Sequence, residues 1–387
     1  MSTTPIIQGW CPGALRPMMS GDGLVVRVRL RGGRLTAAQA MGIADLALAH
    51  GNGMLDLSSR ANLQIRGVTE ASHPALIDGL RGLGLIDDSA EAEGRRNILI
   101  TPFWQAGDAA PRIAAALEEA LANPQAPDTP GKFGFAIDTG PTPVLREASA
   151  DIRIERAGDG LILRAEGMAM GQTVTVEDAA PKAVALAAWF VSSGGCPDGR
   201  GRMAPHIARG MTPDHASVAM AGASTYHPRP GPVPEGYLLG PAFGQLTAQS
   251  LRALAQLGDL RATPWRLLLV EDLRAAPHLP DLISQPDDPL LRVVACTGAP
   301  GCPQALGPTR SLARALAGNV RKGQILHISG CAKGCAQPGP AQTVLLAEAG
   351  GYGLLHNAPA SGTPNQSFTA AALLADPDLI FETPHAP

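Results

Sequence analysis

The chain has 387 residues, a length that suggests two or more domains or two related halves. Its formal net charge of −3 gives no overall field that would attract nucleic acid or an acidic membrane surface. No apolar run approaches the ~20 residues of a membrane span, and the start, MSTTPIIQGW, lacks the pattern of a signal peptide. We therefore expect a cytoplasmic enzyme with neither a nucleic-acid nor a membrane partner.

The first predicted module starts with an alternating strand, LVVRVRL, at 24–30. A helix follows, with Thr36 as its N-cap and Gly51 just past its end. Two short strands, MLDLS and NLQIRG, and a second helix at about 73–83 complete the module. The order strand–helix–strand–strand–helix is the beginning of a ferredoxin-like α+β module.

The pattern of this module returns later in the chain. The segment 240–275 echoes 32–68, because a glycine and then Leu–Thr–Ala opens a helix in both, and an apolar strand follows. Two copies suggest a duplicated protein with a pseudo-twofold cleft between the copies. Residues 197–240, rich in Gly, Pro and His, are predicted to be a linker between the halves.

Each copy is followed by a further α+β segment. After the first copy come a strand (RRNILITPF), a helix (PRIAAALEEALA), a strand (KFGFAIDTG) and a hairpin (ADIRIERAGDGLILRAEG). After the second copy come two loops that contain cysteines. We therefore predict four segments: a first half-domain (1–85), an α+β domain with the linker (86–225), a second half-domain (226–290) and a cysteine-bearing domain (291–387).

The two cysteine loops carry the strongest functional signal. Cys296 and Cys302 lie in CTGAPGC, and Cys331 and Cys335 lie in CAKGC. A predicted strand precedes each loop, LLRVVA before the first and QILHIS before the second. Thiolates gathered in two short glycine-rich loops are typical of the ligands of an iron–sulfur cluster. The four cysteines are therefore predicted to bind a 4Fe–4S cluster.

Other interpretations of the cysteines fit the sequence less well. A structural zinc site usually has paired cysteines two to four residues apart, so the first spacing fits poorly. Disulfides are typical of small, cysteine-dense chains in oxidising compartments. One further hypothesis for the whole chain stays open, a non-catalytic scaffold protein that holds iron–sulfur or zinc. Cys11 and Cys196, in turn-rich segments, are predicted to be ordinary reduced thiols.

The order of these segments resembles the nitrite/sulfite reductase superfamily over nearly the whole chain. LDLSSRANLQIRG resembles its first tetrapyrrole-cleft strand pair and places a cleft arginine at Arg60. GRRNILI places a second at Arg96, and PGKFGFAI places a cleft lysine at Lys132. The resemblance thus implies duplicated ferredoxin-like half-domains plus two α+β domains, the last with the cluster.

Departures from the superfamily point to one of its branches. Gly131 and Gly134 replace two cations that hold a small anion over siroheme in the reductases, and Lys333 replaces an asparagine between the paired cysteines. GWCPGALRPMMSGDGLVVRVR, ACTGAPGC and HISGCAKGCAQP resemble the precorrin-3B synthase branch, in which the tetrapyrrole is the substrate. A siroheme-dependent sulfite or nitrite reductase is the alternative.

The branch implies a monooxygenase of the aerobic cobalamin pathway. It would use O2 to hydroxylate precorrin-3A at the meso carbon between rings A and D, with formation of a γ-lactone. Electrons would come from outside the chain, from NADH or a redox partner protein. A mononuclear non-haem iron would be a possible second cofactor for O2 activation, and no catalytic residue is assigned.

A polycarboxylate substrate calls for a groove lined by basic residues. Arg60, Arg66, Arg96 and Lys132 lie on or beside the predicted cleft strands and are the predicted substrate-binding residues. Arg16, Arg27 and Arg29 are further candidates, although for the last two a solvated strand face is the preferred interpretation.

The histidines do not form an obvious metal-binding triad. His206, His215 and His227 lie together in the predicted linker, where loop histidines are usually exposed. His327, just before the second cysteine loop, is predicted to pack in a strand near the cluster rather than to ligate it.

Overall fold

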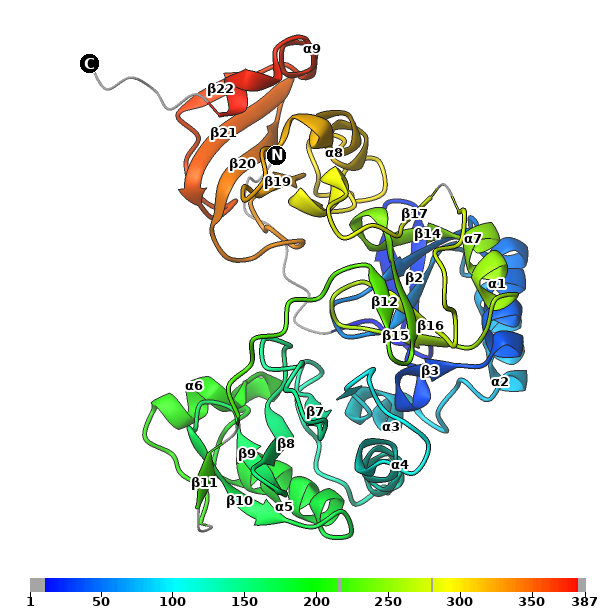
Figure 1. The fold of residues 1–387 in the computed structure, drawn as a ribbon, viewed down its shortest axis with the longest axis vertical. Helices are drawn as coiled ribbons and strands as arrows, with labels where there is room; N and C mark the ends of the chain where they lie inside the picture. Colours follow the sequence, from blue (N-terminus) through cyan, green and yellow to red (C-terminus); the bar gives the residue numbers. More distant parts are fainter. Residues whose placement is uncertain (1–10, 215–217, 221, 280, 382–387) are drawn as a thin grey trace.

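The computed structural model describes residues 11–214, 218–220, 222–279 and 281–381. Figure 1 shows the two ferredoxin-like modules together on one side of the molecule, with a second α/β unit and the C-terminal unit beside them. None of the helices in the described ranges has both the length and the apolar character needed to cross a lipid bilayer.

The sheet of the first module has five strands. They are, in spatial order, β1 (Met18–Ser20), β2 (Gly23–Val28), β5 (Leu63–Val68), β4 (Met54–Leu57) and β14 (Gln245–Thr247). Two helices, α1 (Ala37–His50) and α2 (His73–Gly82), belong to this module. Thr36 caps α1 in a capping box with Gln39, as the sequence predicts.

The second module repeats this order. Its sheet contains β12 (Gly231–Val233), β13 (Gly236–Pro241), β16 (Leu268–Glu271), β15 (Leu260–Ala262) and β3 (Arg34–Leu35), with β17 (Leu282–Ile283) beside β13. Its helix α7 (Ala248–Ala255) packs against α1 (Figure 1). Residues 197–240 are therefore more than the predicted linker, because they also supply strands of the second module.

The two modules exchange short strands. β3 comes from the first copy but pairs with β15, so that Leu35 faces Leu260. β14 comes from the second copy but pairs with β4, so that Leu246 faces Leu55. All four leucines lie in one continuous hydrophobic core. The exchange confirms the predicted duplication and shows that the two halves share their interior.

Leu246→Ala is expected to lower the free energy of unfolding by about 2–5 kcal/mol, as is usual for buried leucine. The Leu246 side chain is 1% exposed and fills the core of the module opposite its own. Urea denaturation tests this, with Leu257→Ala as the control because Leu257 is 41% exposed. The control should change stability by about 0.5 kcal/mol or less. Equal losses in the two variants would contradict a shared core.

A tight turn occurs once in each module. In the first, Ser58 N–H donates to the Asn62 carbonyl at 2.9 Å, and the Ser58 hydroxyl accepts from Asn62 N–H at 3.2 Å. In the second, Thr263 and Leu267 make the same two bonds at 3.1 and 3.2 Å. The fourth residue of each turn has a left-handed backbone: Ala61 in the first (φ 53°) and Arg266 in the second (φ 59°). The two turns are therefore equivalent parts of the duplication.

The second unit lies between the modules in sequence. Its six-stranded sheet is ordered β11 (Ala219–Met220), β10 (Met170–Val174), β9 (Gly160–Ala165), β8 (Ile152–Ala157), β7 (Phe135–Asp138) and β6 (Ile98–Ile100). The helices in this stretch are α3 (Ala90–Arg95), α4 (Ala109–Ala122), α5 (Ala179–Ser192) and α6 (Met203–Ala208). The predicted strands, helix and hairpin of this region are all present.

The C-terminal unit carries the cysteine loops. Its sheet is ordered β18 (Val293–Ala295), β19 (Leu326–Ser329), β20 (Ala341–Glu348), β21 (Gly351–Ala358) and β22 (Gln366–Phe368), with helices α8 (Arg310–Leu316) and α9 (Ala370–Ala375). β18 and β19 are adjacent and parallel. Since parallel strands end at the same edge, the two cysteine loops that follow them meet there.

The prediction that Arg27 and Arg29 lie on a solvated strand face is wrong. They are 9% and 4% exposed, respectively. Both faces of β2 are covered, because Glu93 draws the N-terminal segment across it by accepting the backbone N–H groups of Ala14 and Leu15. Alternation along the strand records which side chains share a face, but not what covers that face.

Candidate functional site

The two cysteine loops are joined by hydrogen bonds. The backbone N–H of Gly330 donates to Cys296 Sγ at 3.2 Å. Leu306 N–H donates to the Gly330 carbonyl at 2.8 Å, and the Thr309 hydroxyl donates to the Cys296 carbonyl at 2.6 Å. These bonds hold the first loop, with Cys296 and Cys302, against the second, with Cys331 and Cys335.

The four thiols lie within electrostatic range of one another. Burial raises the pKa of Cys331, a backbone hydrogen bond at Lys333 lowers it, and Cys302 and Cys296 raise it further. Burial likewise raises the pKa of Cys335, which also responds to the other three cysteines. Among the residues that the structure describes, no three His, Cys, Asp or Glu side chains gather as ligands of a single metal ion.

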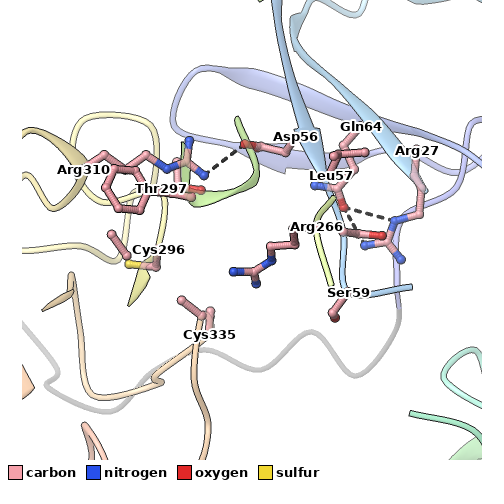
Figure 2. Close-up of a pocket in the computed structure, with 14 residues that line it drawn as sticks. Arg27, Asp56, Leu57, Ser59, Gln64, Arg266, Cys296, Thr297, Arg310 and Cys335 are labelled. Atoms are coloured by element: carbon pink, nitrogen blue, oxygen red, sulfur yellow. Dashed lines mark hydrogen bonds and ion pairs between the residues drawn. The ribbon is translucent and has the colours of Figure 1, made fainter. Parts of the chain in front are cut away.

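A partly open cavity of about 280 Å³ lies between the cysteine loops and the ferredoxin-like modules. Figure 2 shows arginines from both modules and from the C-terminal unit around it, with Cys296 and Cys335 at one side. Its lining includes Arg27, Asp56, Ser58, Ser59, Gln64, Phe243, Arg266, Cys296, Thr297, Arg310 and Cys335. The cavity thus brings a thiol pair and several cations to one place.

The three arginines of this cavity differ in their partners. Arg27 donates to Gln64 Oε1 at 3.1 and 2.7 Å, and although burial lowers its pKa, the nearby Cys11 raises it. Arg310 pairs with Asp56 Oδ1 at 3.0 Å. Arg266 makes no hydrogen bond or ion pair with the described residues, and burial lowers its pKa. Sequence analysis identified Arg27 only as a weak candidate and missed Arg266 and Arg310.

Arg66, a predicted substrate-binding residue, makes ion pairs and a hydrogen bond within the protein. Its guanidinium pairs with Asp22 at 2.6 Å and Asp56 at 3.7 Å, and it donates to the Gly301 carbonyl at 3.1 Å. The Ser20 hydroxyl donates a hydrogen bond to the same carbonyl at 2.8 Å. Because Gly301 precedes Cys302, Arg66 anchors the first cysteine loop to the first module.

Arg96 is also an internal residue. Its side chain is 4% exposed and donates to both carboxylate oxygens of Asp87, at 2.8 and 2.7 Å, and to the Arg29 carbonyl at 3.1 Å. It is not among the residues that line the cavity. The prediction of a substrate-binding role does not fit this position, because Nε and Nη2 of Arg96 already donate to these internal partners.

Arg60 faces the second α/β unit, where the superfamily has its lysines. It donates to the Lys132 carbonyl at 3.0 Å and to the Ser149 hydroxyl at 3.4 Å. The Lys132 side chain itself is exposed. A Cβ at Gly134 would lie 2.7 Å from Asn97 Nδ2 and 3.3 Å from Arg60 Nη1. A larger side chain at position 134 would therefore meet Asn97 first and Arg60 next.

The electrostatics around Arg60 link it to the cavity. Burial lowers the pKa of Arg60, the nearby Cys11 raises it, and Arg202 and Arg27 lower it. Arg202 comes from the predicted linker and is held by Asp151 at 2.9 Å. Cys11, predicted to be an ordinary loop thiol, thus lies among arginines, whereas Cys196 packs against the core of the second unit.

Two of the three histidines of the predicted linker, His206 and His227, lie within the described residues. His206 is buried and contacts the Ser193 hydroxyl at 2.8 Å and Arg209 at 3.1 Å. His227 is exposed, and His215 lies outside the described residues. Among the residues that the structure describes, no group of three His, Cys, Asp or Glu side chains includes either histidine.

His327 lies in β19 and is completely buried, as predicted for a packed strand residue. Within the described structure, neither ring nitrogen has a hydrogen-bond partner. Burial lowers its pKa from 6.5 to about 4. The folded state therefore binds a proton less readily than the unfolded state, so acid favours unfolding.

The histidine is expected to make stability sensitive to mild acid. As the pH falls from 7 to 5, the unfolded imidazole gains a proton while the folded one stays neutral, which costs about 2 kcal/mol of stability. Between pH 7 and pH 5, the unfolding free energy of the wild type should fall by about 2 kcal/mol more than that of His327→Leu. His227→Leu, at an exposed position, is the control. Equal pH dependence in the wild type and His327→Leu would contradict the assignment.

Comparison with known proteins identifies relatives of both the modules and the whole chain. The model of the nitrite/sulfite reductase ferredoxin-like half domain matches residues 16–83. A precorrin-3B synthase of Sinorhizobium sp is 30% identical, over 92% of this chain and 84% of its own length. The chloroplastic ferredoxin–nitrite reductase of Zea mays is 36% identical over 80 residues, which make up 20% of this chain and 14% of that protein.

The fold has a counterpart among solved structures. The Mycobacterium tuberculosis NirA protein matches with a TM-score of 0.66, covering 92% of this chain and 79% of that one at 19% identity. At this identity the likeness concerns the fold.

Proposed function

The chain belongs to the precorrin-3B synthase family, an oxidoreductase family of cobalamin biosynthesis, and we propose that it uses O2 to hydroxylate precorrin-3A. One oxygen atom bonds to the meso carbon between rings A and D, and a ring A acetate closes a γ-lactone. The other oxygen atom leaves as water. Two electrons and two protons complete the balance, and the electrons come from an external reductant, NADH or a redox partner protein.

The observation that carries this proposal is the cavity shared by cysteines and arginines. Precorrin-3A is a macrocycle whose edge bears many carboxylates, and guanidinium groups pair with carboxylates through two parallel bonds. Arg27, Arg266 and Arg310 supply such groups beside Cys296 and Cys335. A substrate edge in this cavity would therefore lie against the cysteine site. Arg60 and the exposed Lys132 offer further cations toward the second unit.

The four cysteines fit a 4Fe–4S cluster as its ligands. Both loops follow parallel strands of one rigid sheet, and the thiols respond to one another electrostatically. When bound, the cluster would supply single electrons to the adjacent cavity. The N–H of Gly330, which donates to Cys296 Sγ, would stabilise the ligand in its anionic form.

The residues also favour oxygenation over the alternative, reduction of a small anion on siroheme. The superfamily cations at positions 131 and 134 are glycines here, and Gly134 is closely approached by Arg60 and Asn97. A site without these cations lacks the field that stabilises charge on a reacting anion.

Aerobic incubation with precorrin-3A, a chemical reductant and ¹⁸O2 tests the proposal. Mass spectrometry should find one labelled oxygen atom in the product and a mass that agrees with the hydroxy-lactone. The matched control is the same mixture under ¹⁸O-labelled water and ordinary O2, which should leave the new oxygen unlabelled. A product without oxygen from O2, or haem-type absorption bands that persist after desalting, would contradict the proposal and favour a siroheme reductase.

A further inference from the structure

Arg266 is the unpaired cation in the lining of the cavity. Figure 2 shows its side chain extending into the cavity, between Ser59 and the side where Cys296 and Cys335 lie. No hydrogen bond or ion pair joins it to any residue in the described ranges, whereas Arg310 is held by Asp56. A half-buried guanidinium without a partner leaves five N–H donors available to a ligand.

The local fold holds Arg266 in this position despite strain. Its backbone is left-handed, with φ 59°, a conformation that favours glycine. Gly244 leaves space for its stem, because a Cβ there would approach Arg266 Cδ to 2.8 Å. Burial also disfavours the charged guanidinium. Strain and desolvation at one residue are expected where function, rather than stability, determines the side chain.

The duplication places an arginine in each of two equivalent turns. The turn 263–267 is equivalent to the turn 58–62. Arg266 is the fourth residue of its turn, where the first turn has Ala61, and Arg60 is the third residue of the first turn. The two arginines therefore come from the two modules, at neighbouring rather than equivalent turn positions.

We propose that Arg266 binds a carboxylate of the tetrapyrrole substrate at the edge of the macrocycle that faces the cysteine loops. This inference rests on the proposed function and deepens it, because it assigns the residue that orients this edge of the substrate. Arg60, in the equivalent turn of the first module, would hold another carboxylate. The bidentate fork of arginine suits a carboxylate, whereas lysine would offer only a point charge.

Substrate binding by Arg266→Gly tests the assignment. Its affinity for precorrin-3A, measured anaerobically so that no turnover occurs, should fall by about 10–100-fold, the loss expected for a charge-assisted hydrogen-bond pair. Its Tm should not fall, because glycine relieves the left-handed backbone and a desolvated charge is removed. Arg266→Lys should recover only part of the affinity. Iron and acid-labile sulfide should equal the wild-type values.

Asp272→Gly is the matched control. Asp272 lies in the same module with a similar backbone (φ 58°), and its side chain is 91% exposed. The Asp272→Gly variant should likewise keep its Tm, and its affinity for precorrin-3A should equal that of the wild type. Wild-type affinity in Arg266→Gly would overturn the inference, as would a Tm well below that of the control, which would indicate a structural role. A changed reduction potential of the cluster in Arg266→Gly, with unchanged affinity for precorrin-3A, would also overturn the inference. Failure of the wild type to bind precorrin-3A would instead count against the proposed function.

Discussion

Replacing Cys296 with serine is expected to remove the iron–sulfur cluster and reduce oxygenation of precorrin-3A below about one hundredth of the wild-type rate. Cys296 is one of the two cysteines that line the cavity, and its Sγ accepts a hydrogen bond from the Gly330 N–H. Serine offers a hard hydroxyl with a far higher pKa than a thiol, so it is a poor ligand for the irons of a cluster. Iron and acid-labile sulfide, measured on anaerobically purified protein, should fall to background together with activity.

Cys196→Ser provides the matched control. Cys196 is half-buried and packs against the core of the second unit, remote in sequence from both cysteine loops. This variant should keep its full complement of iron and sulfide. A Cys296→Ser protein that retains the wild-type amount of sulfide would contradict the predicted ligand set. Loss of iron in both variants to the same extent would indicate general misfolding.

Arg66→Ala is expected to have the second largest effect, a loss of about 3–5 kcal/mol of stability together with a labile cluster. The change leaves Asp22 without its partner and removes a donor from the Gly301 carbonyl. The Arg66 side chain is 7% exposed, so water cannot readily replace what is lost. The rate of cluster loss to an iron chelator should rise, because Gly301 adjoins Cys302.

Two variants separate these effects. Arg81→Ala removes the exposed ion pair between Arg81 and Asp78 and should cost about 1 kcal/mol or less. Arg66→Lys keeps the charge but loses the fork, and should recover part of the stability while the cluster stays more labile than in the wild type. Arg66→Ala with wild-type stability and an unchanged rate of cluster loss would show that these contacts do not anchor the loop.

Much of the fold follows from local patterns in the sequence. The cap at Thr36, the alternating strand that becomes β2 and the hairpin around Gly158 all depend on neighbours along the chain, and the structure confirms them. The repeat was visible because the same Leu–Thr–Ala opening precedes both long helices of the modules. The strands before both cysteine loops were also predicted, since short apolar runs end where the glycine-rich loops begin.

The candidate site was harder to predict because it depends on partners distant in sequence. Arg66 and Arg96 carry the right charge for substrate binding, but Asp22 and Asp87 already pair with them. Arg266 lies in a segment without any family motif. The equivalent position in the turn around Ser58 is Ala61, so the repeat did not indicate it either. Residue type thus shows which cations exist, whereas the tertiary fold decides which of them remain available.

The exchange of β3 and β14 has a consequence for synthesis on the ribosome. β4 obtains its outer neighbour only when residues 245–247 have been translated, so the nascent first module exposes an open sheet edge until then. Nearly two hundred residues separate β4 from β14 in the sequence. The emerging polypeptide therefore passes through a long interval in which chaperones are expected to protect that edge from pairing with other chains.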